Sequence, residues 1–229
     1  MFDGSGDNSD MDAQTIIARR VAQELKAGML VNLGVGIPTL VANYVPQGMQ
    51  IFFQSENGLI GTGPIPEEGM IEPHLTDAAG KPVSALPGAC TFDSAMSFGL
   101  IRGHHLDMTV LGALEVDEAG HLANWTIPGK LVPGMGGAMD LVAGARRVVV
   151  AMQHSARGKS KLVRRCSLPL TALRPVDLVV TELAVIAFQA GTATLMETAP
   201  GVSVDAVLAA TEATLMVPAR VPEMNLMGA

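Results

Sequence analysis

The sequence predicts a single α/β domain of mostly parallel strands, and three observations support this prediction. The chain has 229 residues, of which 48% are hydrophobic, so it can bury one sizeable core. Short apolar runs typical of strands alternate with segments that carry helix caps, which is the order of elements in α/β folds. Residues 147–152 are rich in β-branched side chains and apolar on both faces, as strands in a covered parallel sheet are.

The first expected helix begins after Asp12, whose carboxylate can cap it. Its apolar positions approximate a single face, and they are Ile16, Ile17, Val21 and Leu25. Gly28 is expected to end this helix in the left-handed conformation. Residues 29–33 then predict a buried strand, and Pro38 suits the first position of a short helix over 39–44.

A second strand is expected at 51–53, and it leads into Glu56. Residues 55–90 contain many glycines and prolines, so this stretch is expected to be long, ordered and irregular. Order is favoured by the apolar side chains of Leu59, Ile60, Ile65, Met70, Ile71 and Leu75.

The second half of the chain continues the alternation of helices and strands. The expected elements are, in order, a helix capped by Thr91 or Asp93 and ending near Ile101, a strand at 108–111, a helix opened by the glycine cluster at 134–140 and running toward Gly144, strands at 147–152 and 177–182, a hairpin of 186–188 and 192–196 through Ala190 and Gly191, and a helix over 204–211 capped by Ser203. No repeat and no Ser/Pro-rich linker is present. Residues 12–218 are therefore expected to form the domain, after a disordered leader at 1–11 and before a tail at 219–229.

The composition disfavours several classes of function. A net charge of −7 and an aromatic content of 3% argue against a surface that binds nucleic acid. No apolar run approaches the roughly 20 residues that cross a membrane, and the first ten residues lack the apolar core of a signal peptide. Cys90 and Cys166 lie far apart without metal-ligand spacing, so both are expected to be buried thiols of a cytoplasmic protein.

Glu56 is the first candidate for chemistry, because it follows a predicted strand directly and precedes Asn57 and Gly58. A carboxylate at the end of a buried strand is poorly explained as surface decoration. From the residues alone three roles stay open: a nucleophile, a general base, or a structural carboxylate that ties down its loop. A metal site is not expected, because the five histidines form no ligand cluster, and no Gly-x-Ser-x-Gly motif of a serine nucleophile occurs.

Two glycine-rich turns, at 34–36 and 134–137, follow predicted strands or precede helices. Such turns let a ligand approach backbone N–H groups, so both could donate hydrogen bonds to an oxyanion or to phosphates; tight packing of strand on helix is the structural alternative. The first turn also resembles a dinucleotide fingerprint with Glu56 as the ribose acid. Thr39 replaces the third glycine and Pro38 interrupts the turn, which disfavours NAD binding.

A run of basic residues follows the expected strand at 147–152, and it comprises Arg157, Lys159, Lys161, Arg164 and Arg165. Such a run is usually a solvated loop, and a subsidiary role in holding phosphates is the alternative. Lys81 and Lys130 are better placed, because each stands next to a turn residue in a glycine-rich region.

Five segments of the chain form a recognisable set: residues 31–38, 54–58, 122–130, 134–140 and 166–171. In sequence and in order they resemble the B (β) subunit of the 3-oxoacid coenzyme A transferases, and the similarity runs from about Asp12 to Val217. This resemblance implies an open α/β sheet layered with helices.

The resemblance also implies a reaction. Glu56 stands at the position of the nucleophile in the Ser-Glu-Asn-Gly motif of that family, which carries acyl and CoA in turn while CoA passes between two acids. The resemblance implies substrate or CoA binding by Asn32, Gly34, Gly36, Asn57, Lys81, Gly136 and Gly137. It implies no metal and no permanently bound cofactor, since coenzyme A acts as substrate and covalent intermediate.

The implied donor is succinyl-CoA, the implied acceptor is acetoacetate or 3-oxoadipate, and the implied partner is an A subunit in an α2β2 heterotetramer. Two departures from the family's pattern bear on the acceptor more than on the reaction: Asp77 lies in a segment one residue longer than usual, and His104 replaces a common glycine. The rival hypotheses are an acyl-CoA hydrolase or related-fold isomerase with Glu56 as general base, and a binding subunit whose chemistry lies in its partner.

Overall fold

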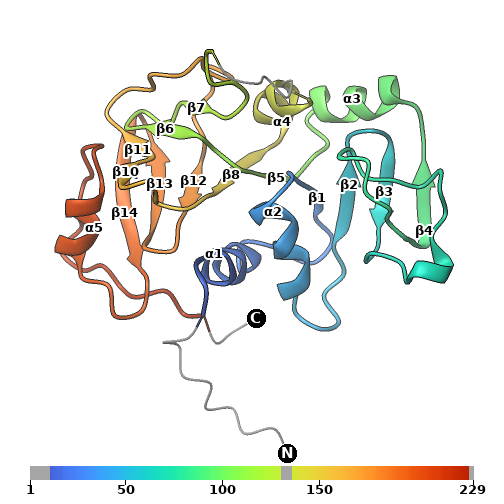
Figure 1. Ribbon diagram of the computed structural model, residues 1–229, viewed down its shortest axis with the longest axis horizontal. Helices are drawn as coiled ribbons and strands as arrows, with labels where there is room; N and C mark the ends of the chain where they lie inside the picture. Colours follow the sequence, from blue (N-terminus) through green and yellow to red (C-terminus); the bar gives the residue numbers. More distant parts are fainter. Residues whose placement is uncertain (1–10, 130–135, 227–229) are drawn as a thin grey trace, which may run out of the picture.

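The computed structural model describes residues 11–129 and 136–226, which form a nine-stranded sheet with helices on both faces (Figure 1). From edge to edge the strands are β14 (Thr192–Thr198), β13 (Ala184–Gln189), β12 (Leu178–Val180), β8 (Arg147–Ala151), β5 (Met108–Leu111), β1 (Leu30–Leu33), β2 (Phe52–Ser55), β3 (Leu59–Thr62) and β4 (Ala85–Thr91). The five central strands, β12 to β2, are parallel, and two antiparallel strands extend the sheet at each edge. The predicted α/β fold, with an open and mostly parallel sheet, is confirmed.

Both faces of the central strands are buried, because side chains alternate along each strand. In β8, Val148 and Val150 enter one core, whereas Val149 and Ala151 enter the other. The covering helices are α3 (Ser94–Arg102), α4 (Ala138–Gly144) and α5 (Val204–Ala210) over the first core, and α1 (Ala13–Ala22), α2 (Ile37–Leu40) and the 3-10 turn η2 (Val41–Tyr44) over the second. This layering explains why the central strands are apolar throughout.

The expectation of an irregular stretch at 55–90 is wrong in part. The stretch contains β3 and β4, an antiparallel pair that extends the sheet beyond β2, and the short 3-10 turn η3 (Glu68–Met70). Gly61 lies where the β3–β4 register shifts, with φ +89°, and a Cβ there would lie 2.8 Å from the Cβ of Ala89. Glycine is therefore required for close approach inside a strand, and it obscures the strand pattern.

Helix α1 begins as predicted but ends earlier. The Asp12 carboxylate accepts a hydrogen bond from the Thr15 N–H at 2.7 Å, as a capping residue does. The helix ends at Ala22, so Gly28 does not terminate it. Gly28 adopts the expected left-handed conformation, φ +85°, in the turn before β1, where its N–H donates to the Gln50 carbonyl at 2.8 Å.

The other predicted caps and turns are confirmed. Asp93, rather than Thr91, caps α3, and Ser203 caps α5. Ala190 and Gly191 both have positive φ in the tight turn between β13 and β14. Five short strands were not expected, because two or three residues show no periodicity; they are β6 (Glu115–Asp117), β7 (Leu122–Ala123), β9 (Ser155–Ala156), β10 (Lys159–Ser160) and β11 (Leu162–Val163).

The prediction of two buried thiols is wrong. Cys90 is exposed on the edge strand β4, and Cys166 is only partly buried. Burial and the neighbouring carboxylates of Asp117 and Glu115 nonetheless raise the pKa of Cys166 to about 12. The described helices include none long and apolar enough to cross a membrane. The expected leader, apart from residue 11, lies outside the described residues, as does the end of the tail at 227–229.

Candidate active site

The carboxyl ends of three neighbouring parallel strands converge near Glu56. Strand β1 lies between β2 and β5, and the register places Asn32 opposite Gln54 on one side and Thr109 on the other. Glu56 is half buried in the turn that follows β2. Its Oε2 lies 3.1 Å from Nδ2 of Asn32, so the structure brings these two predicted residues into contact.

A buried hydrogen-bond network surrounds the Asn32 amide. Nδ2 of Asn32 also lies 2.9 Å from Oε1 and 3.2 Å from the main-chain oxygen of Gln54. Gln54 in turn donates through Nε2 to the hydroxyl of Ser97 on α3 at 3.0 Å, and the Thr109 hydroxyl lies 3.4 Å from Oδ1 of Asn32. These four side chains are no more than 4% exposed. Buried polar groups persist when they satisfy one another, and such networks hold their members in place.

Gly137 lies against the other side of Glu56. It is buried directly before α4, and a Cβ built on it would lie 3.2 Å from Cγ and 3.4 Å from Oε1 of Glu56. Its neighbour Gly136 is exposed, with φ +49°. The absence of a side chain at Gly137 therefore leaves clearance at the carboxylate.

The turn 34–36 serves packing and chain direction. Gly34 donates its N–H to the main chain of β5 at 2.8 Å, and a Cβ there would lie 3.1 Å from the same carbonyl oxygen. Gly36 has φ +93° and open space around it, and α2 begins directly after it. Pro38 stands in the first turn of α2, as predicted.

The segment 76–82 is held against the turn after β2. The Asn57 amide donates to the main-chain oxygen of the first residue of this segment at 2.8 Å, and the Ser55 hydroxyl accepts a hydrogen bond from its backbone at 2.9 Å. The Asp77 carboxylate accepts two hydrogen bonds of 2.8 Å from N–H groups of the same segment, so it shapes this turn. Lys81 is exposed at the end of the turn.

His104 adopts φ +59°, a conformation that favours glycine. Its Nδ1 lies 2.9 Å from the carbonyl oxygen of Gly144, between the ends of α3 and α4. The glycine that His104 replaces in the related family is thus matched by a backbone requirement of this turn, and a helix–helix contact accommodates the ring.

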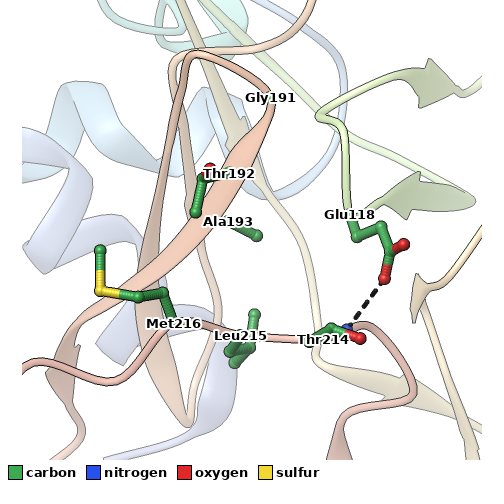
Figure 2. A pocket seen from close by; sticks show the side chains of 7 residues that line it. All are labelled: Glu118, Gly191, Thr192, Ala193, Thr214, Leu215 and Met216. Atoms are coloured by element: carbon green, nitrogen blue, oxygen red, sulfur yellow. Dashed lines mark hydrogen bonds between the residues drawn. The ribbon is translucent and has the colours of Figure 1, made fainter.

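Hollows elsewhere on the described surface contain none of the residues predicted for the site. A groove of about 870 Å³ is lined by Lys159, Lys161 and Arg165 of the basic run, and burial lowers the pKa of Lys161. Figure 2 shows a smaller hollow of about 290 Å³, where Glu118 accepts a hydrogen bond from the Thr214 N–H at 3.2 Å. The described residues include no group of three potential metal ligands, and Lys130 and residues 134 and 135 lie outside them.

Comparison with known proteins gives the family. The profile of the Coenzyme A transferase family matches residues 14–210. The chain is also 56% identical over 210 residues to the beta subunit of the acetate CoA-transferase of Escherichia coli (strain K12), covering 91% of this chain and 96% of that relative. This chain belongs to the coenzyme A transferase family.

Other members of the family match equally widely. In Helicobacter pylori (strain ATCC 700392 / 26695), the B-type subunit of the succinyl-CoA:3-ketoacid coenzyme A transferase is 52% identical over 198 residues, which cover 86% of this chain and 95% of the relative. Among solved structures, an acyl-CoA transferase from Escherichia coli O157:H7 superposes with a TM-score of 0.75 at 24% identity. The superposition covers 94% of this chain and 44% of that chain, so this chain spans less than half of the solved one. At this identity the likeness supports the fold alone.

Sequence reasoning did not assign Gln54, Ser97 or Thr109 to the site of this coenzyme A transferase chain. Thr109 interrupts the otherwise apolar strand 108–111, just as Asn32 interrupts β1. Ser97 precedes the buried Ile101 by one helical turn, on the same face of α3. A polar residue on each of three buried surfaces was the available signal, but its meaning depended on the strand order.

Proposed function

We propose that this chain is the beta subunit of an enzyme that transfers CoA from succinyl-CoA to a 3-oxoacid, with Glu56 as the covalent carrier. The observation that carries this proposal is the position of Glu56 at the carboxyl ends of the central strands, between the donor Asn32 and the bare Gly137. A carboxylate that only tied down its own loop would accept hydrogen bonds from that loop. Glu56 instead accepts one from a neighbouring strand.

The proposed reaction has two halves, each of two steps. An oxygen of Glu56 attacks the thioester carbonyl of the acyl-CoA, the C–S bond breaks, and CoA leaves as a thiolate, which gives a mixed anhydride. The thiolate then attacks the carboxyl carbon of Glu56, the anhydride C–O bond breaks, and the first acid leaves as a carboxylate. The acceptor acid repeats both steps in reverse on the glutamyl-CoA thioester and leaves as its CoA ester, so protons balance and no ATP is consumed.

Asn32 and Gly137 have distinct parts in this scheme. Each attack on the carboxyl carbon of Glu56 places negative charge on a glutamyl oxygen. An N–H group of Asn32, 3.1 Å from Oε2 and held in a buried network, supports stabilisation of that charge. The space that a Cβ of Gly137 would occupy supports entry of the acyl group and the CoA sulfur beside Oε1.

The proposed partner is an A subunit that completes the CoA site, in an α2β2 heterotetramer. The two relatives described above are named as B or beta subunits. Glu56 is only half buried in this chain, whereas an anhydride survives only where water is excluded. Large apolar side chains are exposed on the turn before α2, on the β3–β4 connection and at the start of α3, as on surfaces that bind partners: Val35, Ile65, Met70 and Met96.

The acceptor acid is the part of the proposal with two candidates. The Helicobacter pylori relative is named for a 3-ketoacid, and the Escherichia coli relative is named for acetate. Acetate is therefore a second acceptor class beside acetoacetate and 3-oxoadipate. We further place the enzyme in the cytoplasm, which the unpaired thiols of Cys90 and Cys166 favour.

The test is CoA transfer by the chain assembled with its A subunit, from succinyl-CoA to acetate, acetoacetate and 3-oxoadipate in parallel. Glu56→Ala and Glu56→Gln should each abolish transfer to every acceptor. Normal transfer by either variant would overturn the role of Glu56 and place the chemistry in the partner. Hydrolysis of the CoA ester without transfer to any acid would instead support the hydrolase in which Glu56 is a general base.

A further inference from the structure

We infer that Gln54 and Ser97 are positioning residues for the transfer reaction: together they hold the Asn32 amide where one of its N–H groups points at Glu56. This inference rests on the proposed function of Glu56. It concerns two side chains behind the reacting carboxylate, in the layer between β2 and α3. Both are buried, with 4% exposure at Gln54 and none at Ser97.

The Asn32 amide nitrogen has more acceptors than hydrogens. Nδ2 carries two hydrogens, but three acceptor atoms lie within hydrogen-bond distance: Oε1 of Gln54 at 2.9 Å, Oε2 of Glu56 at 3.1 Å and the main-chain oxygen of Gln54 at 3.2 Å. The carboxylate and the main-chain oxygen only accept, so they fix which end of the amide faces them. The competition among the three acceptors decides where each hydrogen points.

The planar geometry of the amide links the two hydrogens of Asn32. The two N–H bonds of an amide diverge at a fixed angle in one plane. When the shortest contact, to Oε1 of Gln54, anchors one hydrogen, the other is directed toward Glu56. Without this anchor the first hydrogen can turn to the main-chain oxygen, and the second then turns away from the carboxylate.

Ser97 fixes the orientation of the Gln54 amide in the same way. Oε1 of Gln54 faces Asn32 only while the other end of the Gln54 amide has an acceptor, and the Ser97 hydroxyl lies 3.0 Å from Nε2. Ser97 is on α3, whereas Gln54 and Asn32 belong to adjacent strands of the sheet. The position of α3 therefore reaches Glu56 through Gln54 and Asn32, and Ser97 acts at one further remove than Gln54.

The experiment measures the rate at which succinyl-CoA forms a CoA adduct on the chain assembled with its A subunit, using rapid quench and mass spectrometry. Gln54→Met keeps the side-chain volume but removes both polar ends, and it should slow adduct formation about 10- to 100-fold. Ser97→Ala should slow it less, and the KM for succinyl-CoA should stay within about threefold in both variants, because neither residue contacts the substrate. Wild-type rates in Gln54→Met, or a loss confined to KM, would overturn the inference.

A matched control separates positioning from general loss of packing. Thr211→Val removes a buried hydrogen bond to His154 next to α5, at the far end of the sheet from β2 (Figure 1), and it should leave the adduct rate unchanged. A loss as large as that of Gln54→Met would contradict a specific role for Gln54.

A second readout does not depend on the chemistry. A crystal structure of the assembled Gln54→Met variant should show Nδ2 of Asn32 displaced beyond hydrogen-bond distance of Glu56, and an unchanged contact would overturn the inference. If the wild-type enzyme forms no adduct at all, the proposed function fails, and this structure alone decides whether Gln54 positions Asn32.

Discussion

The carboxylate of Glu56 and the amide of Asn32, 24 residues apart, meet across two parallel strands at 3.1 Å. The contact follows from the register of β1 and β2, which places Asn32 opposite Gln54, two residues before Glu56. The nucleophile proposed here and its nearest donor therefore depend on the central strands of the sheet rather than on a flexible loop. That origin makes the contact rigid, and rigid donors are the ones that stabilise developing charge.

Replacing Asn32 with Leu should lower the rate of CoA transfer about 10²- to 10³-fold, because Glu56 loses the donor that faces its developing oxyanion. The measurement is steady-state transfer by the assembled enzyme, with circular dichroism to confirm the fold. Asn124→Ala removes an amide that bonds a main-chain carbonyl outside this network and serves as the control. Equal rates in Asn32→Leu and wild type would show that the contact is incidental.

Gly137→Ala should slow transfer at least about tenfold while changing stability little, because the new Cβ would lie 3.2 Å from Cγ of Glu56 and displace it. Gly99→Ala is the matched control, since Gly99 is exposed on α3 with open space around it. This control should keep full activity and gain about 0.5–1 kcal/mol of stability from helix propensity. Full activity in Gly137→Ala would contradict the close packing of Gly137 on the carboxylate.

Gly58→Ala should destabilise the chain by more than about 3 kcal/mol, because strain and a steric clash combine. Gly58 has φ +119°, and its Cβ would lie 2.0 Å from the carbonyl oxygen of Phe92. Gly158 also has a positive φ, +75°, but open space around it, so Gly158→Ala should cost only about 1 kcal/mol. Urea unfolding of both variants gives the comparison, and equal losses would rule out the clash as the cause.

Stability should fall as the pH is lowered from about 6.5 toward 4, because of His154. This ring is fully buried, with its two nitrogens 2.9 Å from the hydroxyls of Thr181 and Thr211, and burial lowers its pKa from 6.5 to about 4. Between these values the unfolded chain binds a proton that the folded chain does not, so the free energy of unfolding decreases with falling pH. The loss between pH 7 and pH 5 should be on the order of 2 kcal/mol.

His154→Gln isolates this effect. The variant should be less stable than wild type at pH 7 and should lose less stability between pH 7 and pH 5, as measured by urea unfolding at both values. If wild type and variant change by the same amount, other groups cause the pH dependence.

Much of the fold could be predicted from the sequence, because its signals are local. The caps Asp12, Asp93 and Ser203 and the turn at Ala190 show themselves within a few residues. The strands β3 and β4 could not be read in the same way. Their glycines serve close approach between strands, and β4 is exposed along most of its length, so it lacks the apolar alternation of a covered strand.

The candidate site was predictable only where a motif marked it. The position of Glu56 at a strand end indicated chemistry, and family resemblance indicated Asn32 and Gly137. Gln54, Ser97 and Thr109 belong to three elements whose proximity depends on the strand order β5-β1-β2 and on the packing of α3. No spacing along the chain encodes that proximity.

The most direct test of Glu56 as covalent carrier is the mass of the intact chain, assembled with its A subunit and mixed with succinyl-CoA without an acceptor. We expect CoA to become covalently attached to this chain, peptide mapping to place it on Glu56, and the acceptor acid to remove it. Transfer or hydrolysis with no adduct on this chain, or an adduct on another residue, would contradict this role of Glu56.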